Sequence, residues 1–285
     1  MFLGHINDLR PQEKKPLRQF QNRKILVERD GGYYLANNVC PHQGSLILAD
    51  RGFNLTCQYH GWSWNDDGEP ATAGTTRLCN NSKIVMKPAA AVNGLLFSES
   101  YDLGSLADID LTHMQLVEER VDTVRADFKN IIDVFLDVDH IPIVHRGLYD
   151  SIGIGSTDIK WVYHDWGNLQ LVEKTSDYSS EFRSTLLGDE KIAASWITIY
   201  PYTMIEWQPG AMFITVCVPD QNSTDVVVYK YRDQRYSDHN WQMNDAIWEE
   251  AWRQDRHQAE SIVKNSVAPN NLEESKLHFR KWIDR

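Results

Sequence analysis

Two short motifs dominate the first third of the chain: Cys40-Pro-His42-Gln-Gly44 and Cys57-Gln-Tyr-His60-Gly-Trp62, with fourteen residues between His42 and Cys57. Each motif carries one cysteine and one histidine. Zinc also binds two cysteines and two histidines, but its sites usually place cysteine near cysteine and histidine near histidine. One ligand of each type in each motif favours a 2Fe–2S cluster, in which one iron keeps two thiolates and the other takes two imidazoles. The predicted ligands are Cys40, His42, Cys57 and His60, with a structural zinc site as the alternative.

The residues beside these ligands also suit a cluster. Pro41, Gly44 and Gly61 predict turns there, as two opposed loop tips require. The pattern resembles the Rieske domain, whose motif is C-x-H, a loop, and then C-x-x-H-G-W. Gln43 departs from the ring-hydroxylating members of that family, which usually carry arginine, and the loop between the motifs is at the short end. The resemblance implies a Rieske 2Fe–2S cluster bound by the four predicted ligands.

Length, charge and cysteine usage limit the remaining choices. A chain of 285 residues can form two domains, and its formal charge of −11 disfavours nucleic acid and anionic membranes as partners. No segment approaches the apolar length of a membrane span, and the N-terminus does not resemble a signal peptide. Two cysteines remain beyond the cluster ligands, Cys79 and Cys217, and they indicate no disulfide framework. We expect Cys217 to be a core thiol and the protein to be cytoplasmic.

Short-strand signals fill residues 17–99. They include a hairpin in which Asp30-Gly-Gly32 is the turn that follows Lys24–Arg29. This pattern predicts a small all-β domain over residues 1–100. Residues 101–119 lose clear periodicity and are predicted to link this domain to the next one.

The predicted second domain, residues 101–285, begins with a helical segment and continues with strands. Residues 155–235 alternate in the manner of antiparallel strands, and residues 238–263 return to a helical period. The expected fold class is therefore α+β, with an antiparallel sheet and a long C-terminal helix in the second domain.

A second group of metal-ligand residues lies at the start of this domain. Helical spacing runs from Asp127 to His140, and Asp137 lies three residues before His140, which makes the two neighbours on a helix. Pro142 is expected to bend or end the helix and to bring His145 back towards His140. Two imidazoles beside a carboxylate suggest a metal site. The alternative is that both histidines are ordinary polar residues at a helix end.

A mononuclear non-haem iron site of this type needs a third ligand, a carboxylate. At about 100° per residue, Asp255 falls in the middle of the apolar face of the predicted C-terminal helix. Asp245 lies at the edge of that face, whereas Glu249, Glu250 and Glu260 point away. An inward carboxylate is costly unless it is paired or binds a metal. Asp255 is the predicted third ligand and Asp245 the reserve; a pairing of Asp255 with an arginine or a helix end is the alternative.

These segments resemble the alpha (terminal oxygenase) subunits of the Rieske non-haem iron oxygenases, in the ring-hydroxylating dioxygenase and choline monooxygenase group. Asp127-Phe-Lys129 stands at the N-W-K of their motif, and Val134 replaces its usual asparagine. The motif positions of the bridging acid and the two histidines are occupied by Asp137, His140 and His145.

The C-terminal helix carries the rest of this resemblance. Residues 248–260 resemble the W-x6-D-x4-E pattern of the group, with Asp255 at the ligand position, and residues 272–282 resemble its ending. The resemblance implies a catalytic domain of the helix-grip (SRPBCC, Bet v 1-like) fold over residues 101–285. It also implies a mononuclear Fe(II) held by His140, His145 and Asp255.

The implied function is that of a terminal oxygenase. A reductase or ferredoxin that draws on NAD(P)H would supply electrons, and O₂ would be used to mono- or dioxygenate, or oxidatively demethylate, a small organic substrate. The resemblance also implies a homotrimer in which Asp137 hydrogen-bonds to His140 and bridges to the partner's His60. Residues 196–207 and 212–218 are expected to line the pocket, but the substrate stays open. The rival function is a Rieske electron-transfer protein without oxygenase chemistry, which would need only the first domain.

Overall fold

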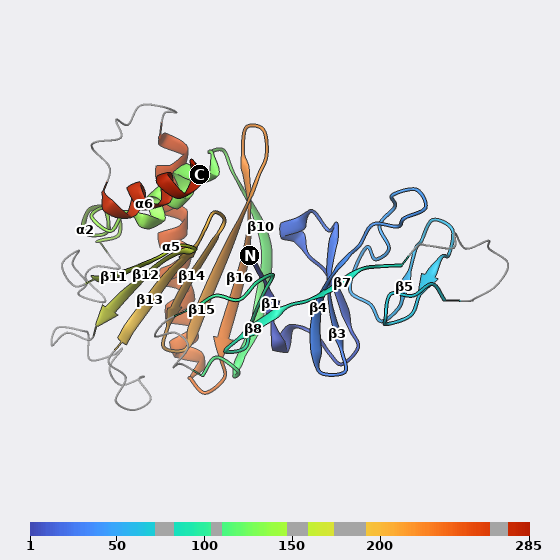
Figure 1. Cartoon of the computed structure of the whole chain (residues 1–285). Helices are drawn as coiled ribbons and strands as arrows, with labels where there is room; N and C mark the ends of the chain where they lie inside the picture. Colours follow the sequence, from blue (N-terminus) through green and yellow to red (C-terminus); the bar gives the residue numbers. More distant parts are fainter. Residues whose placement is uncertain (72–82, 104–109, 147–158, 174–191, 263–272) are drawn as a thin grey trace. The chain divides into compact units, whose positions relative to one another are not determined.

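The computed structural model describes residues 1–71, 83–103, 110–146, 159–173, 192–262 and 273–285 (Figure 1). The chain divides into two compact units, the first formed by Met1–Asp102 with Asp110–Thr112 and the second by the rest. The domain boundary near residue 100 stays a prediction, and Cys79 lies outside the described residues. None of the helices in the described ranges is both long and apolar enough to cross a membrane.

The first unit is built from short antiparallel strands in three sheets with the orders β1-β9-β8, β2-β3-β4-β7 and β5-β6. The strands are β1 (Phe2–His5), β2 (Lys14–Pro16), β3 (Lys24–Arg29), β4 (Gly32–Asn37), β5 (Leu55–Thr56), β6 (Ser63–Trp64), β7 (Met86–Pro88), β8 (Ala90–Val92) and β9 (Leu95–Phe97). Two 3₁₀ turns, η1 (Ile6–Asp8) and η2 (Arg18–Phe20), connect the first of them.

The predicted hairpin joins β3 to β4. Arg29 pairs with Gly32, so the loop contains only Asp30 and Gly31. Both loop residues have positive φ, 52° and 79°. Two successive residues of this conformation match the twist of the flanking strands, which explains why an Asp-Gly pair ends one strand and begins the next. The hairpin prediction is confirmed.

The second unit contains one antiparallel sheet of seven strands in the order β10-β16-β15-β14-β13-β12-β11. The strands are β10 (Met114–Val124), β11 (Ile159–His164), β12 (Gly167–Glu173), β13 (Ile192–Ile199), β14 (Thr203–Gln208), β15 (Ala211–Pro219) and β16 (Thr224–Asp233). The helices are α1 (Phe128–Leu136), α2 (Ile141–Val144), α5 (Asp238–Ser261) and α6 (Glu274–Ile283). The long helix α5 lies along one face of the sheet (Figure 1).

Aromatic packing fixes α5 on the sheet. The helix starts at Ser237, whose hydroxyl accepts a hydrogen bond from the Asn240 N–H. Trp248 and Trp252 are both buried, and Trp248 stacks on Phe213 of β15 with ring centroids 4.9 Å apart. Each such side chain contributes roughly 2–3 kcal/mol through burial alone. The sheet with its C-terminal helix confirms the predicted α+β class and helix-grip architecture.

Strand β10 corrects one prediction, because residues 114–119 belong to the sheet and not to a linker. The pairing with β16 shifts register between Leu116 and Glu118. Such a bulge places an extra residue in the strand and interrupts the alternation of side chains. Since most side chains of β10 are also half-buried or exposed, its pattern does not stand out in the sequence.

Helix α1 is also shorter than predicted, because it ends at Leu136 and not at His140. Asp137 has extended backbone angles, φ −90° and ψ 104°. Its carboxylate Oδ1 accepts a hydrogen bond from the N–H of Asp139 at 3.0 Å. A side chain that bonds its own backbone in this way competes with the helical hydrogen bonds and favours a turn. Asp137 and His140 are therefore not neighbours on one helix.

Pro142 does not end that helix either. It lies in the first turn of the separate one-turn helix α2. Proline is tolerated at this position because its missing N–H would have no helical partner there. The effect on the histidines is nevertheless the expected one, since the turn of α2 lies between His140 and His145.

Candidate metal centres

The two motifs of the first unit form two loops with the same backbone hydrogen bonds. The carbonyl oxygens of Cys40 and Cys57 accept hydrogen bonds from the N–H groups of Gly44 and Gly61, both at 2.9 Å. Each cysteine N–H in turn donates to the carbonyl oxygen five residues later, at 2.8 and 2.7 Å. Both glycines have positive φ, 78° and 71°, which a residue with a side chain adopts at a cost. The glycines therefore permit the matched turns that present the ligands.

The four predicted ligand residues differ in exposure in a way that suits a Rieske cluster. Cys40 and Cys57 are 3% and 1% exposed, whereas both histidines of the motifs are exposed. The rings of His42 and His60 lie with centroids 4.9 Å apart. Burial, and the Cys57 thiol beside it, raises the pKa of the Cys40 thiol. Two buried thiols that need a metal to ionise, with two imidazoles further out, fit a cluster with one inner and one outer iron.

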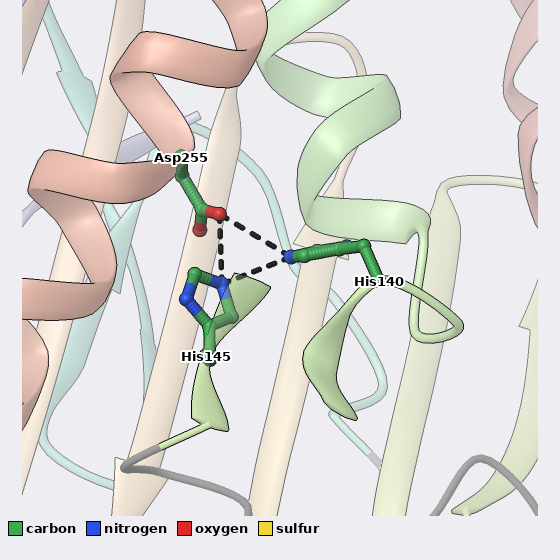
Figure 2. Close-up of side chains that lie close together, drawn as sticks. All are labelled: His140, His145 and Asp255. Atoms are coloured by element: carbon green, nitrogen blue, oxygen red, sulfur yellow. Dashed lines mark hydrogen bonds and ion pairs between the residues drawn. The ribbon is translucent and has the colours of Figure 1, made fainter. Parts of the chain in front are cut away.

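The second candidate centre lies in the second unit, where three ligand atoms converge (Figure 2). His140 and His145 flank the single turn of α2, and Asp255 projects from α5. The two histidine Nε2 atoms are 2.9 Å apart. Asp255 Oδ1 lies 2.8 Å from Nε2 of His145 and 3.3 Å from Nε2 of His140.

These separations fit a metal. Three ligands bound at about 2.1 Å and at right angles to one another have donor atoms about 3.0 Å apart. Asp255 Oδ1 is buried, and among the described residues it has no partner besides its ion-pair contacts with the two histidines. Two imidazoles and one carboxylate on one side of a metal, with the other positions open, are typical of non-haem Fe(II) oxygenases. The residues present therefore fit a mononuclear iron.

The charges of these three groups are strongly coupled. Burial alone would raise the pKa of Asp255 and lower the pKa of both histidines. Their mutual attraction outweighs burial: it lowers the pKa of Asp255, raises that of His145, and with Asp137 raises that of His140 to about 9. Without a metal, the group holds a proton at neutral pH. A divalent cation would replace that proton.

Gln254 fixes the orientation of one histidine. Its Oε1 lies 2.7 Å from Nδ1 of His145, so the ring donates its Nδ1–H there and keeps Nε2 for a metal. Glu250 accepts a hydrogen bond from the other end of the same amide at 2.7 Å. The sequence analysis missed Gln254, although its position one residue before the predicted ligand Asp255 was a usable signal.

Asp137 lies on the Nδ1 side of His140. The distance from Asp137 Oδ1 to that nitrogen is 3.9 Å, which is an ion-pair contact and longer than the hydrogen bond that the resemblance implied. Lys276 of α6 contacts the other oxygen at 2.8 Å. Burial opposes ionisation of Asp137, but His140 and Lys276 together hold its pKa well below the usual range. A quarter of the Asp137 side chain remains exposed.

Asp245, the reserve ligand, and Glu249, a predicted surface residue, both pair with a lysine of the sheet. Asp245 pairs with Lys230 at 2.5 Å and is not in the group with the histidines. Glu249 was predicted to point away from the sheet, and this is wrong, because it pairs with Lys230 of β16 and with Arg120 of β10. The Lys230 side chain is only 3% exposed, so it attracts carboxylates of α5 to the sheet.

A cavity of about 400 Å³ adjoins the three converging side chains, and its wall includes Trp196, Glu206 and Gln170. A neighbouring cavity of about 430 Å³ is also lined by Glu206 and by Met204 and Thr215. The expected pocket strands therefore do contribute to these walls. Glu206 was not singled out from the sequence, although a carboxylate between Ile205 and Trp207 on a predicted strand was a usable signal.

Comparisons with known proteins agree with this arrangement. Residues 1–81 match the family model described as the Rieske [2Fe-2S] domain. Putrescine 2-hydroxylase of Bordetella bronchiseptica is 25% identical over 279 residues, which cover 82% of this chain and 63% of that protein. The carnitine monooxygenase oxygenase subunit of Acinetobacter baumannii is 26% identical over 223 residues, which cover 69% of this chain and 58% of that subunit.

The fold is similar to that of a solved structure. The quaternary ammonium Rieske monooxygenase CntA, crystallised with an inhibitor, matches with a TM-score of 0.75 and 17% identity over 100% of this chain and 87% of that one. The chain spans less than two thirds of the length of the two curated relatives. The likeness in fold thus extends through both units, whereas the family model covers the first alone.

Proposed function

We propose that the chain is an alpha (terminal oxygenase) subunit of the Rieske oxygenases, and that it uses O₂ and electrons from an external reductase or ferredoxin to hydroxylate a small organic substrate. The Rieske family model, the two curated relatives and the likeness in fold support this proposal. Its cofactors are a 2Fe–2S Rieske cluster and one mononuclear iron. When bound, the cluster carries single electrons and the mononuclear iron binds and activates O₂.

The convergence of His140, His145 and Asp255 is the observation that carries this proposal. A Rieske electron-transfer protein would need the cluster alone and no second set of ligands. The wall of the cavity beside the three side chains is mostly apolar, with Gln170 and Glu206 as polar groups in it, as is usual for a small-molecule site. A metal position and room for a substrate therefore lie together in the second unit.

The protein groups have separate tasks in this proposal. Cys40, His42, Cys57 and His60 would hold the cluster, and His140, His145 and Asp255 would hold the mononuclear iron. Gln254 would keep Nε2 of His145 towards the metal through its hydrogen bond at 2.7 Å. The apolar walls of the cavity would exclude bulk water from the reacting position.

Asp137 would connect the two centres between subunits. We propose a homotrimer in which the exposed part of its carboxylate accepts a hydrogen bond from the partner's His60. Lys276 and the N–H of Asp139 already hold the carboxylate at 2.8 and 3.0 Å, which would fix its direction before the partner binds. Because the Asp137 carboxylate is already held in place, it would lose little conformational entropy when the bridge forms. Only the partner's His60 would need to be ordered.

The substrate we propose is a small amine. The two curated relatives are named for putrescine and for carnitine, and both of these compounds carry a positively charged nitrogen. Hydroxylation of a carbon not bonded to that nitrogen would give a stable alcohol. Hydroxylation of an N-methyl group would give a carbinolamine, which breaks its C–N bond and releases the one-carbon unit as formaldehyde. The cytoplasmic location expected from the cysteine usage remains a prediction.

A reconstitution experiment tests the proposed function. The purified protein, loaded with iron and sulfide, is expected to absorb in the visible region as a 2Fe–2S protein does. With NADH and a surrogate reductase, it should consume O₂ faster when an amine substrate is present and form a hydroxylated or demethylated product. Visible absorption without any substrate-dependent O₂ use, across diamines and quaternary amines, would instead support the electron-transfer protein. A colourless protein with bound zinc would contradict both.

A further inference from the structure

Five side chains form one row across the face of the sheet that α5 covers. Each is the cross-strand partner of the next, on the strands β12 to β16. In this order the row consists of Gln170, Trp196, Glu206, Phe213 and Lys230. Cross-strand partners point to the same side of a sheet. The first three line the cavity beside the metal ligands, and the last two lie under α5.

The two charged members of this row differ in their partners. Lys230 contacts three carboxylates, those of Asp245, Glu249 and Glu118. Glu206 forms no ion pair with any lysine or arginine of the described residues, and its Oε1 accepts a single hydrogen bond, from Nε1 of Trp248 at 2.8 Å. Burial, together with the nearby charge of Asp255, raises the pKa of the Glu206 carboxyl to about 7. The row therefore contains one satisfied cation and one carboxylate that pairs with no lysine or arginine of the described residues.

The side-chain amide of Gln170 also lacks partners among the described residues. The residue has no exposed surface, and neither end of its amide has a hydrogen-bond partner in the described part of the chain. Buried amides without partners are rare in folded proteins. Gln170 and Glu206 lie on either side of Trp196 in the row and line the same cavity. A ligand in this cavity would find a carboxyl group, an indole ring and an unused amide side by side.

We infer that Glu206, Trp196 and Gln170 form the subsite that binds the charged nitrogen of an amine substrate, with Glu206 as its counter-ion. This inference rests on the proposed function, because it assigns the substrate's charge within the same cavity. A cation between the Glu206 carboxylate and the Trp196 ring gains from both the charge and the face of the indole. The Gln170 carbonyl can accept from an N–H group or a hydroxyl of the same molecule.

The metal makes such a counter-ion necessary. A divalent iron held by two neutral imidazoles and Asp255 keeps a net positive charge, which repels a cationic substrate in a cavity of low dielectric constant. Glu206 belongs to β14 of the sheet, and it lines the same cavity as His140, His145 and Asp255. Its carboxylate balances the substrate's charge and favours a pose with the charged end at the sheet. In that pose the carbon chain of the substrate extends towards the metal.

Glu206 could instead serve only as the acceptor for Trp248. The substitution Glu206→Gln separates the two roles, because the amide oxygen still accepts the indole N–H while the charge is lost. The substitution Gln170→Met removes the Gln170 amide and keeps the charge of Glu206. Glu274→Gln is the matched control, since it neutralises an exposed carboxylate on α6, outside the cavity.

The test is anaerobic titration calorimetry on the iron-loaded full chain, so that ligands bind without turnover. The probes are two pairs of equal shape: choline with 3,3-dimethyl-1-butanol, and butane-1,4-diamine with butane-1,4-diol. We expect the wild type and Glu274→Gln to bind at least one cation at least about tenfold more tightly than its neutral partner. In Glu206→Gln this preference should fall to within about threefold, with iron content unchanged. Gln170→Met should weaken both members of a pair alike.

Two results would overturn the inference and leave the proposed function intact. One is an iron-loaded wild type that shows no preference for either cation over its neutral partner, which requires no variant to fold. The other is a Glu206→Gln protein that keeps the preference of the wild type. A wild type that holds neither iron centre would contradict the proposed function itself, so the two failures are distinguishable.

Discussion

The two candidate metal centres of this chain are built in different ways. The proposed cluster ligands all lie between Cys40 and His60, on two loops whose backbones repeat the same hydrogen bonds. The mononuclear site joins α2 to Asp255 of α5, more than a hundred residues further along the chain. The first centre is defined by local backbone geometry, and the second by the packing of a long helix on a sheet.

This difference predicts how each centre fails. A change on α5 should affect the mononuclear iron and leave the cluster intact, because the cluster's loops draw all their ligands and turns from one short segment. The side chains that orient the second site, such as Gln254 and Lys276, likewise come from the C-terminal helices. Damage to the mononuclear site is therefore expected to be separable from damage to the cluster.

The largest effect is expected from Asp255→Ala. Loss of the only carboxylate among the three converging groups should lower the occupancy of mononuclear iron and reduce substrate hydroxylation by more than about 100-fold. The visible spectrum of the cluster should stay unchanged. Iron analysis together with the spectrum checks both points. Asp245→Ala is the control, because that carboxylate pairs with Lys230, and full iron content in Asp255→Ala would show that the ligand is another residue.

Asp137→Ala should come next, with turnover reduced roughly 10- to 100-fold although both metals are retained. The physical reason is the loss of the proposed bridge to the partner's His60, so reduction of the cluster should proceed while single-turnover product formation slows. Stopped-flow measurement of cluster reoxidation in the presence of substrate and O₂ tests this. The neighbouring Asp139→Ala keeps the N–H that Asp137 uses, so it should behave as the wild type. Reoxidation at the wild-type rate in Asp137→Ala would end the bridge assignment.

Gln254→Leu should have a smaller and graded effect. The substitution removes the acceptor for the Nδ1–H of His145 without removing a ligand. We expect iron to bind about tenfold more weakly at this site, as titration with a competing chelator would measure. Gln258→Leu, one turn further along α5, serves as the control for the loss of an amide. Equal iron affinities in the two variants would mean that the hydrogen bond does not orient the ring.

The smallest effect concerns pH in the metal-free protein. The pKa of His140 is raised to about 9 from 6.5, so the stability that its protonated form provides is complete below pH 6.5 and is lost as the pH rises through 9. The iron-free protein should lose about a few degrees of melting temperature over this interval. The melting temperature of the iron-loaded protein should not fall in this way, because the metal has already replaced the proton. Calorimetric melting of both forms at pH 6 and 9.5 makes the comparison, and equal shifts would contradict the coupling.

The sequence was informative wherever one short segment or one helical period controlled the outcome. The motif spacing from Cys40 to His60 predicts the two loops, and the 3.6-residue period of α5 places Asp255 on the inner face because a helix fixes the direction of each side chain. The end of α1 was predicted wrongly, because the hydrogen bond from Asp137 to its own backbone leaves no mark on the apolar pattern. Lys230 attracts Glu249 to the sheet across the fold, and this contact is equally invisible in the sequence.

Glu206 illustrates the limit most clearly. Its importance comes from Trp196 on the next strand, from Gln170 one strand further, and from the metal-ligand candidates that line the same cavity, and most of these lie far from it in the sequence. The pairing of strands decides which side chains share a row, and a row is known only when the order of the sheet is known.

Metal and sulfide analysis of the purified, reconstituted chain tests most directly whether it carries two distinct iron centres. Two cluster irons and one mononuclear iron predict about three iron atoms and about two acid-labile sulfides per chain. Asp255→Ala should then hold about two of each. If the wild type instead holds as much iron as sulfide, with the same cluster occupancy as Asp255→Ala, no mononuclear iron is bound. That result would contradict the account.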